Sequence, residues 1–269
     1  MIRHVKIEKL WGQYDIEWSL YPDVNILAGI NGSGKSTLLR ILDLALTGGD
    51  GVFLNLFRFL RAIRIDGEGV DINAASGEGC LWYNECGCDF ISTFDKITHE
   101  KKALTGDLSP LSAYLDAVIF DTQRRSLNEY RLKATESPDE GHRISHRLQQ
   151  WIETVNGFFA ATRKTFVIQG SEVFFRQANG ERLALHALSA GEKQLLVILI
   201  NALTQDGQPF TLLMDEPEIS LDIDWQYRLV DTIRTINPAC QLIIATHSPA
   251  IFGDGWNDKL FFMDDILKK

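Results

Sequence analysis

The sequence predicts the α/β fold class, and three observations lead to that prediction. Val24–Ala28 is a short apolar strand pattern that runs through a glycine-rich turn into a helical pattern beginning at Ser36. Phe210–Met214 and Gln241–Ala245 are fully apolar runs, as is typical of strands buried on both faces of a parallel sheet. Between residues 62 and 94 short β-like pieces alternate with glycines, which predicts a meandering antiparallel sheet.

The remaining elements follow from periodicity. Alternation of apolar and polar residues predicts two hairpins, formed by Val5–Leu10 with Asp15–Leu20 and by Thr165–Ile168 with Glu172–Gln177. Apolar residues at helical spacing predict helices over Ser36–Ala45, Ala190–Ala202 and Trp225–Ile236.

Two further segments complete the chain. Ala117–Phe120 is predicted as another short apolar strand. The polar stretch Ser126–Arg163 is predicted as a small helical lobe with a loop at Ser137–Gly141. No repeat, low-complexity tract or flexible linker is evident in the sequence.

Charge and hydropathy limit the function classes. Lys and Arg number 27 and Asp and Glu 36, and the net charge of −9 argues against a broad basic surface for nucleic acid. Small basic clusters remain at Arg58, Arg61 and Arg64 and at Arg124 with Arg125. The longest apolar run, Leu195–Leu203, has about half of the ~20 residues that a membrane span requires, so it predicts a buried helix.

The N-terminal residues alternate apolar and charged side chains and lack the apolar stretch of a secretory signal. We therefore expect a cytoplasmic chain with no membrane contact. Cys80, Cys86 and Cys88 cluster with His99 downstream, but their spacing matches no paired C-x-x-C zinc pattern. A hairpin carrying small residues explains the cluster as well, and we expect free thiols in a reducing compartment.

The segment Gly29–Thr37, GINGSGKST, fits the phosphate-loop pattern G-x-x-x-x-G-K-[ST] and lies between a strand and a helix. Its glycines let backbone N–H groups approach phosphates closely, and the helix N-terminus adds positive potential. Lys35 is expected to reach the β and γ phosphates of ATP, and the Ser36 hydroxyl to hold Mg²⁺. The expected nucleotide contacts in this loop are Asn31, Gly32, Ser33, Gly34, Lys35, Ser36 and Thr37.

The segment Thr211–Asp222, TLLMDEPEISLD, supplies a pair of carboxylates at the end of a buried strand, where parallel sheets bind nucleotides. Asp215 is expected to orient Mg²⁺ through its water shell. Glu216 is expected to polarise the attacking water as a general base, since that role needs a carboxylate about one hydrogen bond from the water.

The segment Leu188–Gln194, LSAGEKQ, adds Ser189 and Gly191 at a helix start, where a hydroxyl and backbone N–H groups can face an anion. This stretch resembles the signature motif of the ABC ATPase superfamily, which touches the γ-phosphate bound by the opposite subunit. The resemblance implies that two copies pair head to tail across two ATP molecules, and that Ser189 and Gly191 complete the partner's site.

The resemblance extends to other motifs. Ser220, Leu221 and Asp222 look like the family's D-loop, and His247 in ATHSP matches its switch histidine, which contacts the γ-phosphate. Gln123, following the strand predicted to end at Phe120, takes the place of the Q-loop glutamine, which contacts Mg²⁺ and the attacking water. Either Trp11 or Tyr14 could stack on adenine, although each could equally be a core residue.

The resemblance implies a P-loop NTPase fold of the ABC-ATPase head type, with a mixed central sheet, an antiparallel β subdomain and a small helical lobe. The chain is then expected to form one domain, 1–269. Residues 1–125 would be the nucleotide-binding lobe with its β insertion, residues 126–163 the helical lobe, and residues 164–269 would carry the signature motif, carboxylates, D-loop and switch histidine.

The segments DEPEISLD and THSP are more similar to those of stand-alone bacterial ATPases related to RecF, SMC and OLD proteins, and of PtuA-type anti-phage ATPases, than to those of transporter subunits. The sequence contains no long coil insertion of the SMC kind, and we expect no Toprim nuclease of the OLD kind, because only a short tail follows Pro249. The similarity implies an ATPase that regulates a separate effector, a nuclease or toxin, in anti-phage defence. The alternatives are a RecF/SMC-like DNA-repair ATPase, a transporter's nucleotide-binding subunit, and an ATP-binding scaffold without useful hydrolysis.

Overall fold

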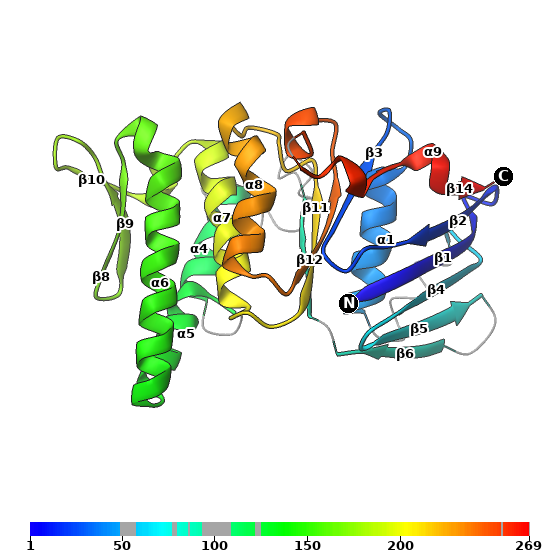
Figure 1. Cartoon of the computed structure of the whole chain (residues 1–269), viewed down its shortest axis with the longest axis horizontal. Helices are drawn as coiled ribbons and strands as arrows, with labels where there is room; N and C mark the ends of the chain where they lie inside the picture. The colour runs from blue at the N-terminus through cyan, green and yellow to red at the C-terminus, as the bar shows by residue number, and fades with distance from the viewer. Residues whose placement is uncertain are drawn as a thin grey trace. The chain divides into compact units, whose positions relative to one another are not determined.

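The structure is a computed structural model that describes residues 1–48, 58–76, 80–85, 87–92, 109–121, 125–253 and 255–268. The chain divides into two compact units (Figure 1). Unit 1 comprises Met1–Thr93, Gln208–Glu218 and Ala239–Lys269, and unit 2 comprises Phe94–Gly207 and Ile219–Pro238. Each unit is therefore assembled from separate stretches of the chain, and each is described by itself.

Unit 1 contains an antiparallel sheet of six strands in the order β14-β2-β1-β4-β5-β6. Val5 pairs with Trp18 and Ile7 with Ile16 across the first hairpin, which confirms the hairpin that alternation predicts. The strands are β1 (Ile2–Leu10), β2 (Tyr14–Ser19), β4 (Ala62–Gly67), β5 (Val70–Ala75), β6 (Cys80–Asn84) and β14 (Leu267–Lys268).

The second sheet of unit 1 has five strands in the order β13-β3-β12-β11-β7, and every neighbouring pair is parallel. Asp215 on β11 pairs with Ala245 on β12, which pairs with Leu27 on β3. The carboxyl ends of these strands thus lie level at one edge of the sheet. The strands are β3 (Val24–Ala28), β7 (Gly87–Ile91), β11 (Phe210–Asp215), β12 (Cys240–Ala245) and β13 (Leu260–Phe262).

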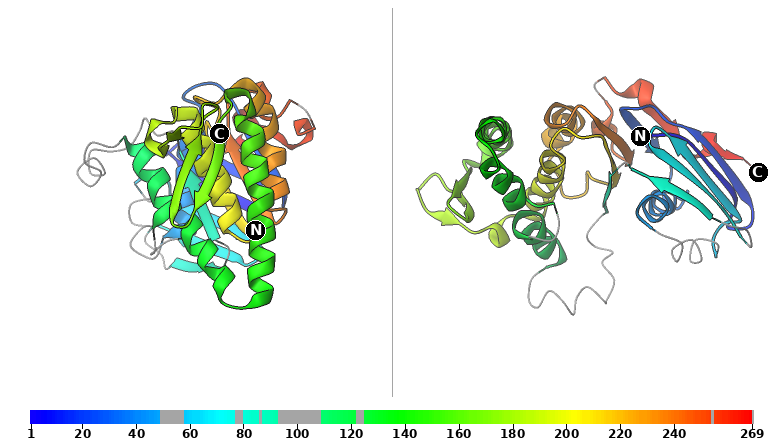
Figure 2. Two further views of the ribbon diagram at one scale, coloured as in Figure 1. Left: turned by 90° about the vertical axis from the view of Figure 1, so that its left-hand side faces the viewer. Right: turned by 90° about the horizontal axis from the view of Figure 1, so that it is seen from below.

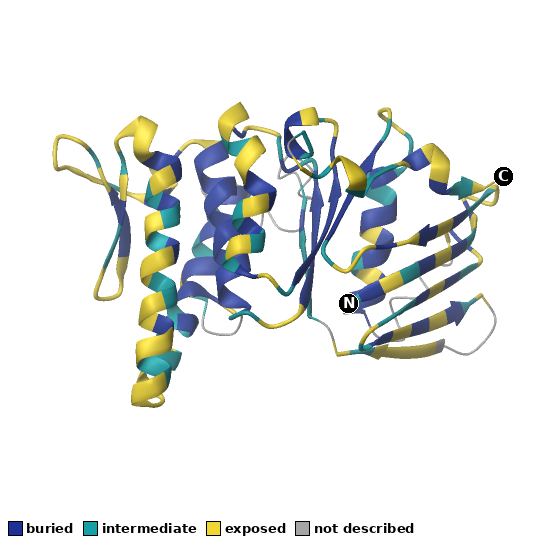
Figure 3. Cartoon of the chain, in the orientation of Figure 1, coloured by how far each residue is buried: buried dark blue, intermediate teal, exposed yellow. Residues whose placement is uncertain are grey.

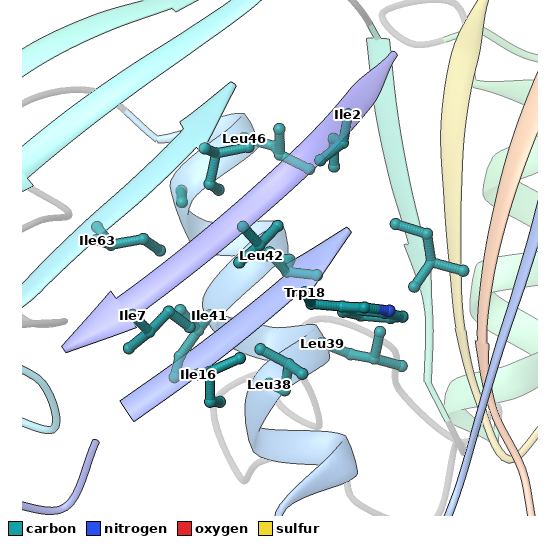
Figure 4. Packing of buried hydrophobic residues seen from close by; sticks show 14 of the residues in the cluster. Ile2, Ile7, Ile16, Trp18, Leu38, Leu39, Ile41, Leu42, Leu46 and Ile63 are labelled. Carbon is teal, nitrogen blue, oxygen red and sulfur yellow. The ribbon is translucent and has the colours of Figure 1, made fainter. Parts of the chain in front are cut away.

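Helix α1 (Lys35–Thr47) joins the two sheets of unit 1 in one hydrophobic core (Figure 4). Its buried face carries Leu38 and Leu42, which belong to the same cluster as Trp18 of the antiparallel sheet and as Leu213 and Ile243 of the parallel sheet. Burying one such side chain stabilises a fold by about 1.5–3 kcal/mol. The helix that begins at the phosphate loop is therefore fixed on both sides. The C-terminal elements of unit 1 are η5 (Pro249–Ile251), η6 (Asn257–Lys259) and α9 (Met263–Ile266).

Unit 2 is mainly helical and adds a three-stranded sheet, β10-β9-β8, whose β8–β9 hairpin confirms the predicted one. Helix α6 lies beside this hairpin (Figure 2, left). The helices in the described part of unit 2 are α4 (Pro110–Phe120), α5 (Leu127–Leu132), η2 (Lys133–Thr135), α6 (Pro138–Phe159), η3 (Ala160–Thr162), η4 (Leu185–Ala187), α7 (Ala190–Thr204) and α8 (Ile223–Ile236). The strands are β8 (Thr165–Gln169), β9 (Glu172–Arg176) and β10 (Arg182–Leu183).

Helix α7 is the centre of unit 2. It is buried from Gly191 to Thr204, whereas α6 exposes one face (Figure 3). The indole N–H of Trp151 on α6 donates to the Leu199 carbonyl at 2.9 Å. The long apolar run is thus a buried helix, as predicted. Within the described ranges, no helix combines the length and apolarity needed to cross a bilayer.

Two expectations about helices are wrong. Ala117–Phe120 is the last turn of α4 and not a strand, because Ser109 caps that helix, Pro110 opens it and its apolar residues are buried at helical spacing. Four apolar residues in a row cannot distinguish a strand from a helix turn. The loop expected at Ser137–Gly141 is the start of α6, where the Ser137 hydroxyl accepts the Glu140 N–H and Pro138 stands at the first helical position.

The antiparallel sheet predicted between 62 and 94 is confirmed for β4, β5 and β6 but not for Gly87–Ile91. That strand, β7, pairs in parallel with β11 at the edge of the second sheet. Parallel and antiparallel strands thus occur in separate sheets. Of the clustered cysteines, Cys88 lies on β7, while the side chain of Cys80 and the residues Cys86 and His99 lie outside the described part of the chain.

Candidate functional site

The loop between β3 and α1 has the backbone of an anion cradle. Gly32 and Gly34 have positive φ values of 79° and 102°, which a side chain rarely adopts. A Cβ at Gly34 would lie 2.6 Å from the Trp11 ring. Gly34 caps α1 without a side-chain hydrogen bond, so backbone N–H groups dominate the helix tip. The other predicted loop contacts lie here too, with Asn31 exposed and Ser33 and Thr37 half-buried.

Lys35 lies at the first position of α1 and is 4% exposed. Its Nζ donates to the carbonyls of Gly29 at 2.9 Å and Ile30 at 3.1 Å, and lies 2.9 Å from Nε2 of His247. Burial lowers the pKa of Lys35, while the carboxylates of Glu216, Asp215 and Glu218 act in the opposite direction. A cation held among carbonyls at a bare helix tip is suited to a polyphosphate.

Ser36 and Asp215 meet at the level carboxyl ends of the parallel strands. The Ser36 hydroxyl donates to Oδ1 of Asp215 at 2.9 Å, and Asp215 is 3% exposed at the end of β11. A hydroxyl and a carboxylate are hard oxygen donors, the type that Mg²⁺ binds. These two residues therefore fit the magnesium site that the sequence predicts. Among described side chains, no group of three or more His, Cys, Asp or Glu is placed to hold a metal by itself.

Glu216 follows Asp215 in a strained conformation. Its φ is +51°, an uncommon value for a residue with a side chain, and such strain amounts to about 1–3 kcal/mol. Its backbone N–H donates to the Ala245 carbonyl at 2.8 Å, which ties this turn to the end of β12. The left-handed turn ends the strand and leaves the Glu216 carboxylate 3.6 Å from Nε2 of His247.

His247 follows β12, and its ring faces Lys35 and Glu216. The Lys35 ammonium can only donate, so Nε2 of His247 is the accepting atom of their 2.9 Å contact. The preceding residue, Thr246, is buried and donates its N–H to the Leu27 carbonyl at 3.1 Å. The structure thus brings Lys35, Ser36, Asp215, Glu216 and His247 together in unit 1.

Ser189 and Gly191 lie at the N-terminus of α7 in unit 2. Ser189 and Glu192 form a reciprocal capping box, with Glu192 N–H to the Ser189 hydroxyl at 3.3 Å and Ser189 N–H to the Glu192 carboxylate at 2.9 Å. Lys164 also binds this carboxylate, with a 2.6 Å contact from Nζ to Oε1. The position of the serine is therefore fixed from within unit 2.

Gly191 packs directly against the predicted D-loop. A Cβ at this position would lie 2.0 Å from the Ser220 carbonyl oxygen, so only glycine fits without displacing that carbonyl. Ser220 itself has a φ of +70°. The helix tip and the D-loop are thus a single interlocked surface of unit 2.

Gln123 and Arg124 lie outside the described residues. The prediction that Gln123 follows a strand is wrong, because the segment ending at Phe120 is the last turn of helix α4. In the basic clusters, Arg125 hydrogen-bonds to Gln205, and Arg64 is 3.5 Å from Asp66. Some of the cationic charge in these clusters is therefore paired within the chain.

Two more residues lie near the site: Glu218, for which the sequence predicts no role, and Trp11, one of two candidates for stacking on adenine. Oε1 of Glu218 accepts the backbone N–H of His247 at 2.8 Å, a contact that the turn after β11 makes and that no motif spacing indicates. Trp11 is 42% exposed with a φ of +52°, and its ring lies against Gly34 and, edge-on, 6.5 Å from the Tyr14 ring. Of the two aromatic candidates, Trp11 therefore contacts the phosphate loop.

Comparisons with known proteins agree on one group. Residues 89–253 match the AAA_21 family, described as "AAA domain, putative AbiEii toxin, Type IV TA system". A curated relative is the DNA double-strand break repair Rad50 ATPase of Sulfolobus acidocaldarius, 29% identical over 118 residues. That match covers 42% of this chain and 13% of the Rad50 protein, so the chain spans only a small part of that relative.

Similar solved structures include three SMC heads. One, the SmcHead bound to the C-winged helix domain of ScpA, has a TM-score of 0.60 at 14% identity and covers 94% of this chain and 91% of that one. The SMC head domain with an extended coiled coil from Pyrococcus furiosus, bound to the C-terminal domain of ScpA, has a TM-score of 0.54 at 15% identity. The head domain from Thermotoga maritima has a TM-score of 0.53 at 14% identity. Each of these two covers 94% of this chain and 91% of the other. At such identities the likeness shows the fold alone.

Proposed function

The chain belongs to this AAA domain family, within the ABC-type, SMC-like superfamily of ATPases, and on that premise we propose that it binds ATP with Mg²⁺ and hydrolyses ATP to ADP and phosphate. The observation that supports this proposal is the cluster in unit 1. Five side chains of the kinds that phosphoryl transfer needs converge from the start of one helix, α1, and from the ends of two parallel strands, β11 and β12.

In the proposed ground state, Lys35 and the N–H groups of the phosphate loop hold the β and γ phosphates. Ser36 would hold Mg²⁺, with Asp215 orienting the ion through its water shell, and the ion would supply positive charge to the phosphate oxygens. The 2.9 Å hydrogen bond between these two side chains supports the assignment, because it brings two hard oxygen donors together. Gln123 is proposed as a further contact to Mg²⁺ and the attacking water, although the structure does not describe it.

In the proposed chemical step, Glu216 accepts a proton from the water that attacks the γ-phosphate, while His247 contacts that phosphate. Two distances support this proposal: Nε2 of His247 lies 3.6 Å from the Glu216 carboxylate and 2.9 Å from Nζ of Lys35, so a proton acceptor and a ring nitrogen lie beside the expected phosphate site. Because Glu216 and His247 are both present and close, catalysis is favoured over a purely scaffolding role.

We further propose that two copies pair across two ATP molecules. Ser189 and Gly191 of one copy would cover the γ-phosphate held by Lys35 of the other, and hydrolysis would remove the group that joins them. The rigid helix tip, held by its capping box and by the D-loop, supports a preformed surface of this kind.

For the biological role, we propose that this switch regulates a separate effector, a nuclease or toxin, in anti-phage defence. The family description, which names an AbiEii toxin and a Type IV TA system, supports this reading. A Rad50 relative described as a DNA double-strand break repair ATPase supports a second candidate, an ATPase that holds DNA. A DNA affinity that appears only with ATP and falls with salt would favour the second candidate.

The test of the proposal is the variant Glu216→Gln, which keeps the shape of the side chain and removes the general base. Mixed with ATP and Mg²⁺, it should accumulate as a dimer in light scattering and lose turnover, while the wild-type chain returns to monomer as ATP is consumed. A variant that stays monomeric with bound ATP would contradict the shared site. Continued turnover would contradict the role of Glu216.

A further inference from the structure

The turn after β11 reaches the candidate switch histidine in two places. Glu216 lies 3.6 Å from the His247 ring, and two residues later Glu218 accepts the His247 backbone N–H at 2.8 Å. Pro217 stands between them and fixes its own φ near −65°, while Glu216 is left-handed. These two constraints fold the turn so that both carboxylates face the end of β12.

The His247 backbone N–H lies beyond the end of strand β12, and its hydrogen bond is to the Glu218 side chain and not to a neighbouring strand. The Ala245 carbonyl accepts the Glu216 N–H, and the Thr246 N–H still reaches the Leu27 carbonyl on β3. One residue later the His247 N–H is bound by a side chain instead of by a neighbouring strand. The orientation of the segment after β12 therefore depends on where the Glu218 carboxylate lies.

We propose that Glu218 is a positioning residue, whose carboxylate oxygen holds the His247 backbone so that the imidazole faces Lys35 and Glu216. This inference rests on the proposed function, because the ring's task is contact with the γ-phosphate. Glu218 acts through its acceptor oxygen Oε1, which binds the His247 backbone N–H. It thereby couples the turn that carries the general base to the loop that carries the histidine.

A different explanation assigns Glu218 an effect through charge alone. Glu218 is among the carboxylates that raise the pKa of Lys35, although burial of Lys35 is the larger effect and lowers it. Under that explanation any neutral replacement would be equally damaging. Under ours, glutamine retains the acceptor oxygen and alanine does not.

The experiment compares Glu218→Gln with Glu218→Ala in the full chain. We expect glutamine to keep kcat within about threefold of the wild type and alanine to lose roughly tenfold to a hundredfold in kcat, with ATP affinity little changed, because misplacement of a catalytic group by about 1 Å has effects of that size. His247→Ala combined with Glu218→Ala should be no slower than His247→Ala alone, since both would act through one ring.

A second readout does not depend on turnover. In protein labelled with ¹⁵N-histidine, the chain has six histidines, and the His247 amide can be assigned from its loss in His247→Asn. A hydrogen bond to a carboxylate should shift this amide proton downfield. We expect the shift to be lost, and the ring ¹⁵N signals to change, in Glu218→Ala, and both to be largely kept in Glu218→Gln. Glu68→Ala is the control, since this carboxylate is 76% exposed at the β4–β5 turn of unit 1.

The results distinguish a positioning role of Glu218 from an effect of its charge. Equal losses of kcat in both variants would assign the effect to charge and overturn the inference, as would unchanged His247 signals in Glu218→Ala. A wild-type chain without turnover would contradict the proposed function. The amide and ring signals would still show whether Glu218 positions the histidine. Matching melting temperatures of the two variants would exclude unfolding as the cause.

Discussion

Helices α1 and α7 both begin at a candidate phosphate site, and their N-termini are held in different ways. In unit 1, α1 starts after Gly34, which offers no side-chain cap, so its tip presents backbone N–H groups and the Lys35 ammonium. In unit 2, α7 starts at Ser189, whose capping box with Glu192 satisfies both partners within the chain. One tip is bare and the other is already capped.

This difference predicts different functions for the two helix N-termini: ATP binding in the single chain for α1, and recognition of a second copy's phosphate for α7. A bare helix tip with a buried lysine has much to gain from an anion, and it should bind ATP in the single chain. A capped tip is stable without a ligand and has little left to offer except the serine hydroxyl proton and the potential of the helix. It should therefore recognise a phosphate only when another copy presents one.

The largest expected effects come from one substitution at each helix N-terminus, and the two should affect ATP binding differently. Lys35→Ala removes the charge that α1 brings to the phosphates, and it should lower both ATP affinity and turnover by about a hundredfold or more. Ser189→Asp keeps a good helix cap but sets a negative charge against the partner's γ-phosphate. This variant should bind ATP as well as the wild type within about threefold, a change of under 1 kcal/mol, yet fail to pair or hydrolyse.

The measurements are titration with a fluorescent ATP analogue, phosphate release, and light scattering with ATP. Lys6→Ala is the matched control in unit 1, because Lys6 is exposed on β1, where its Nζ lies 3.1 Å from the Glu8 carboxylate. Loss of ATP affinity in Ser189→Asp would show that α7 contributes to nucleotide binding in the single chain, and the predicted difference between the two helix N-termini would be wrong.

The sequence predicted the parts of unit 1 that depend on local pattern. The strand, loop and helix around Lys35 follow from the glycine spacing and the apolar runs, and the meeting of Ser36 with Asp215 follows from the rule that parallel strands end at one edge. It did not predict the Glu218 contact, because that contact depends on the left-handed turn at Glu216. A positive φ at a glutamate has no sequence signature, whereas glycine, asparagine and aspartate adopt such values more readily.

In unit 2 the errors came from short segments. Ala117–Phe120 by itself fits a strand, because the cap and first proline of its helix lie seven or more residues earlier, at Ser109 and Pro110. At Ser137 the signal is local, since a capping serine followed by proline and two acidic residues marks a helix start and not a loop. Longer signals were more reliable, and the apolar run in α7 was identified correctly as a buried helix.

The next largest effect should be on stability, from a substitution at the closely packed N-terminus of α7. Gly191→Ala forces a methyl group to within 2.0 Å of the Ser220 carbonyl, and such overpacking should destabilise the fold by about 1–3 kcal/mol. Gly157→Ala is the control in α6, where the added Cβ meets only the Arg228 side chain at 3.7 Å. It should stabilise the helix by about 0.5–1 kcal/mol. Thermal unfolding of both variants compares the two sites, and equal melting temperatures would mean that the D-loop gives way.

The smallest effect should be the pH dependence of the ion pair between Arg143 on α6 and Asp206 just after α7, which belongs to neither helix tip. Burial by itself would raise the pKa of Asp206, but hydrogen bonds from Arg143 and Tyr130 outweigh it and keep the pKa below the ordinary value of 3.8. Both oxygens of Asp206 accept from Arg143 at 2.6 Å. A lowered pKa contributes stability that is present above the unfolded-state pKa and lost as the pH falls through the folded-state pKa.

Asp206→Asn should therefore destabilise the chain at pH 7 by about 1 kcal/mol, a modest value because Arg143 is 41% exposed and solvent screens the pair. The deficit should shrink as the pH falls below about 4, where the wild-type carboxylate also loses its charge. Asparagine tolerates the left-handed φ of +56° at this position, so backbone strain does not confuse the result. Chemical unfolding of the variant and of Asp71→Asn, an exposed carboxylate on β5, across this range measures the difference. A deficit that stays constant down to pH 3 would mean that Asp206 stabilises α6 and α7 by shape and hydrogen-bond geometry, with its charge contributing little.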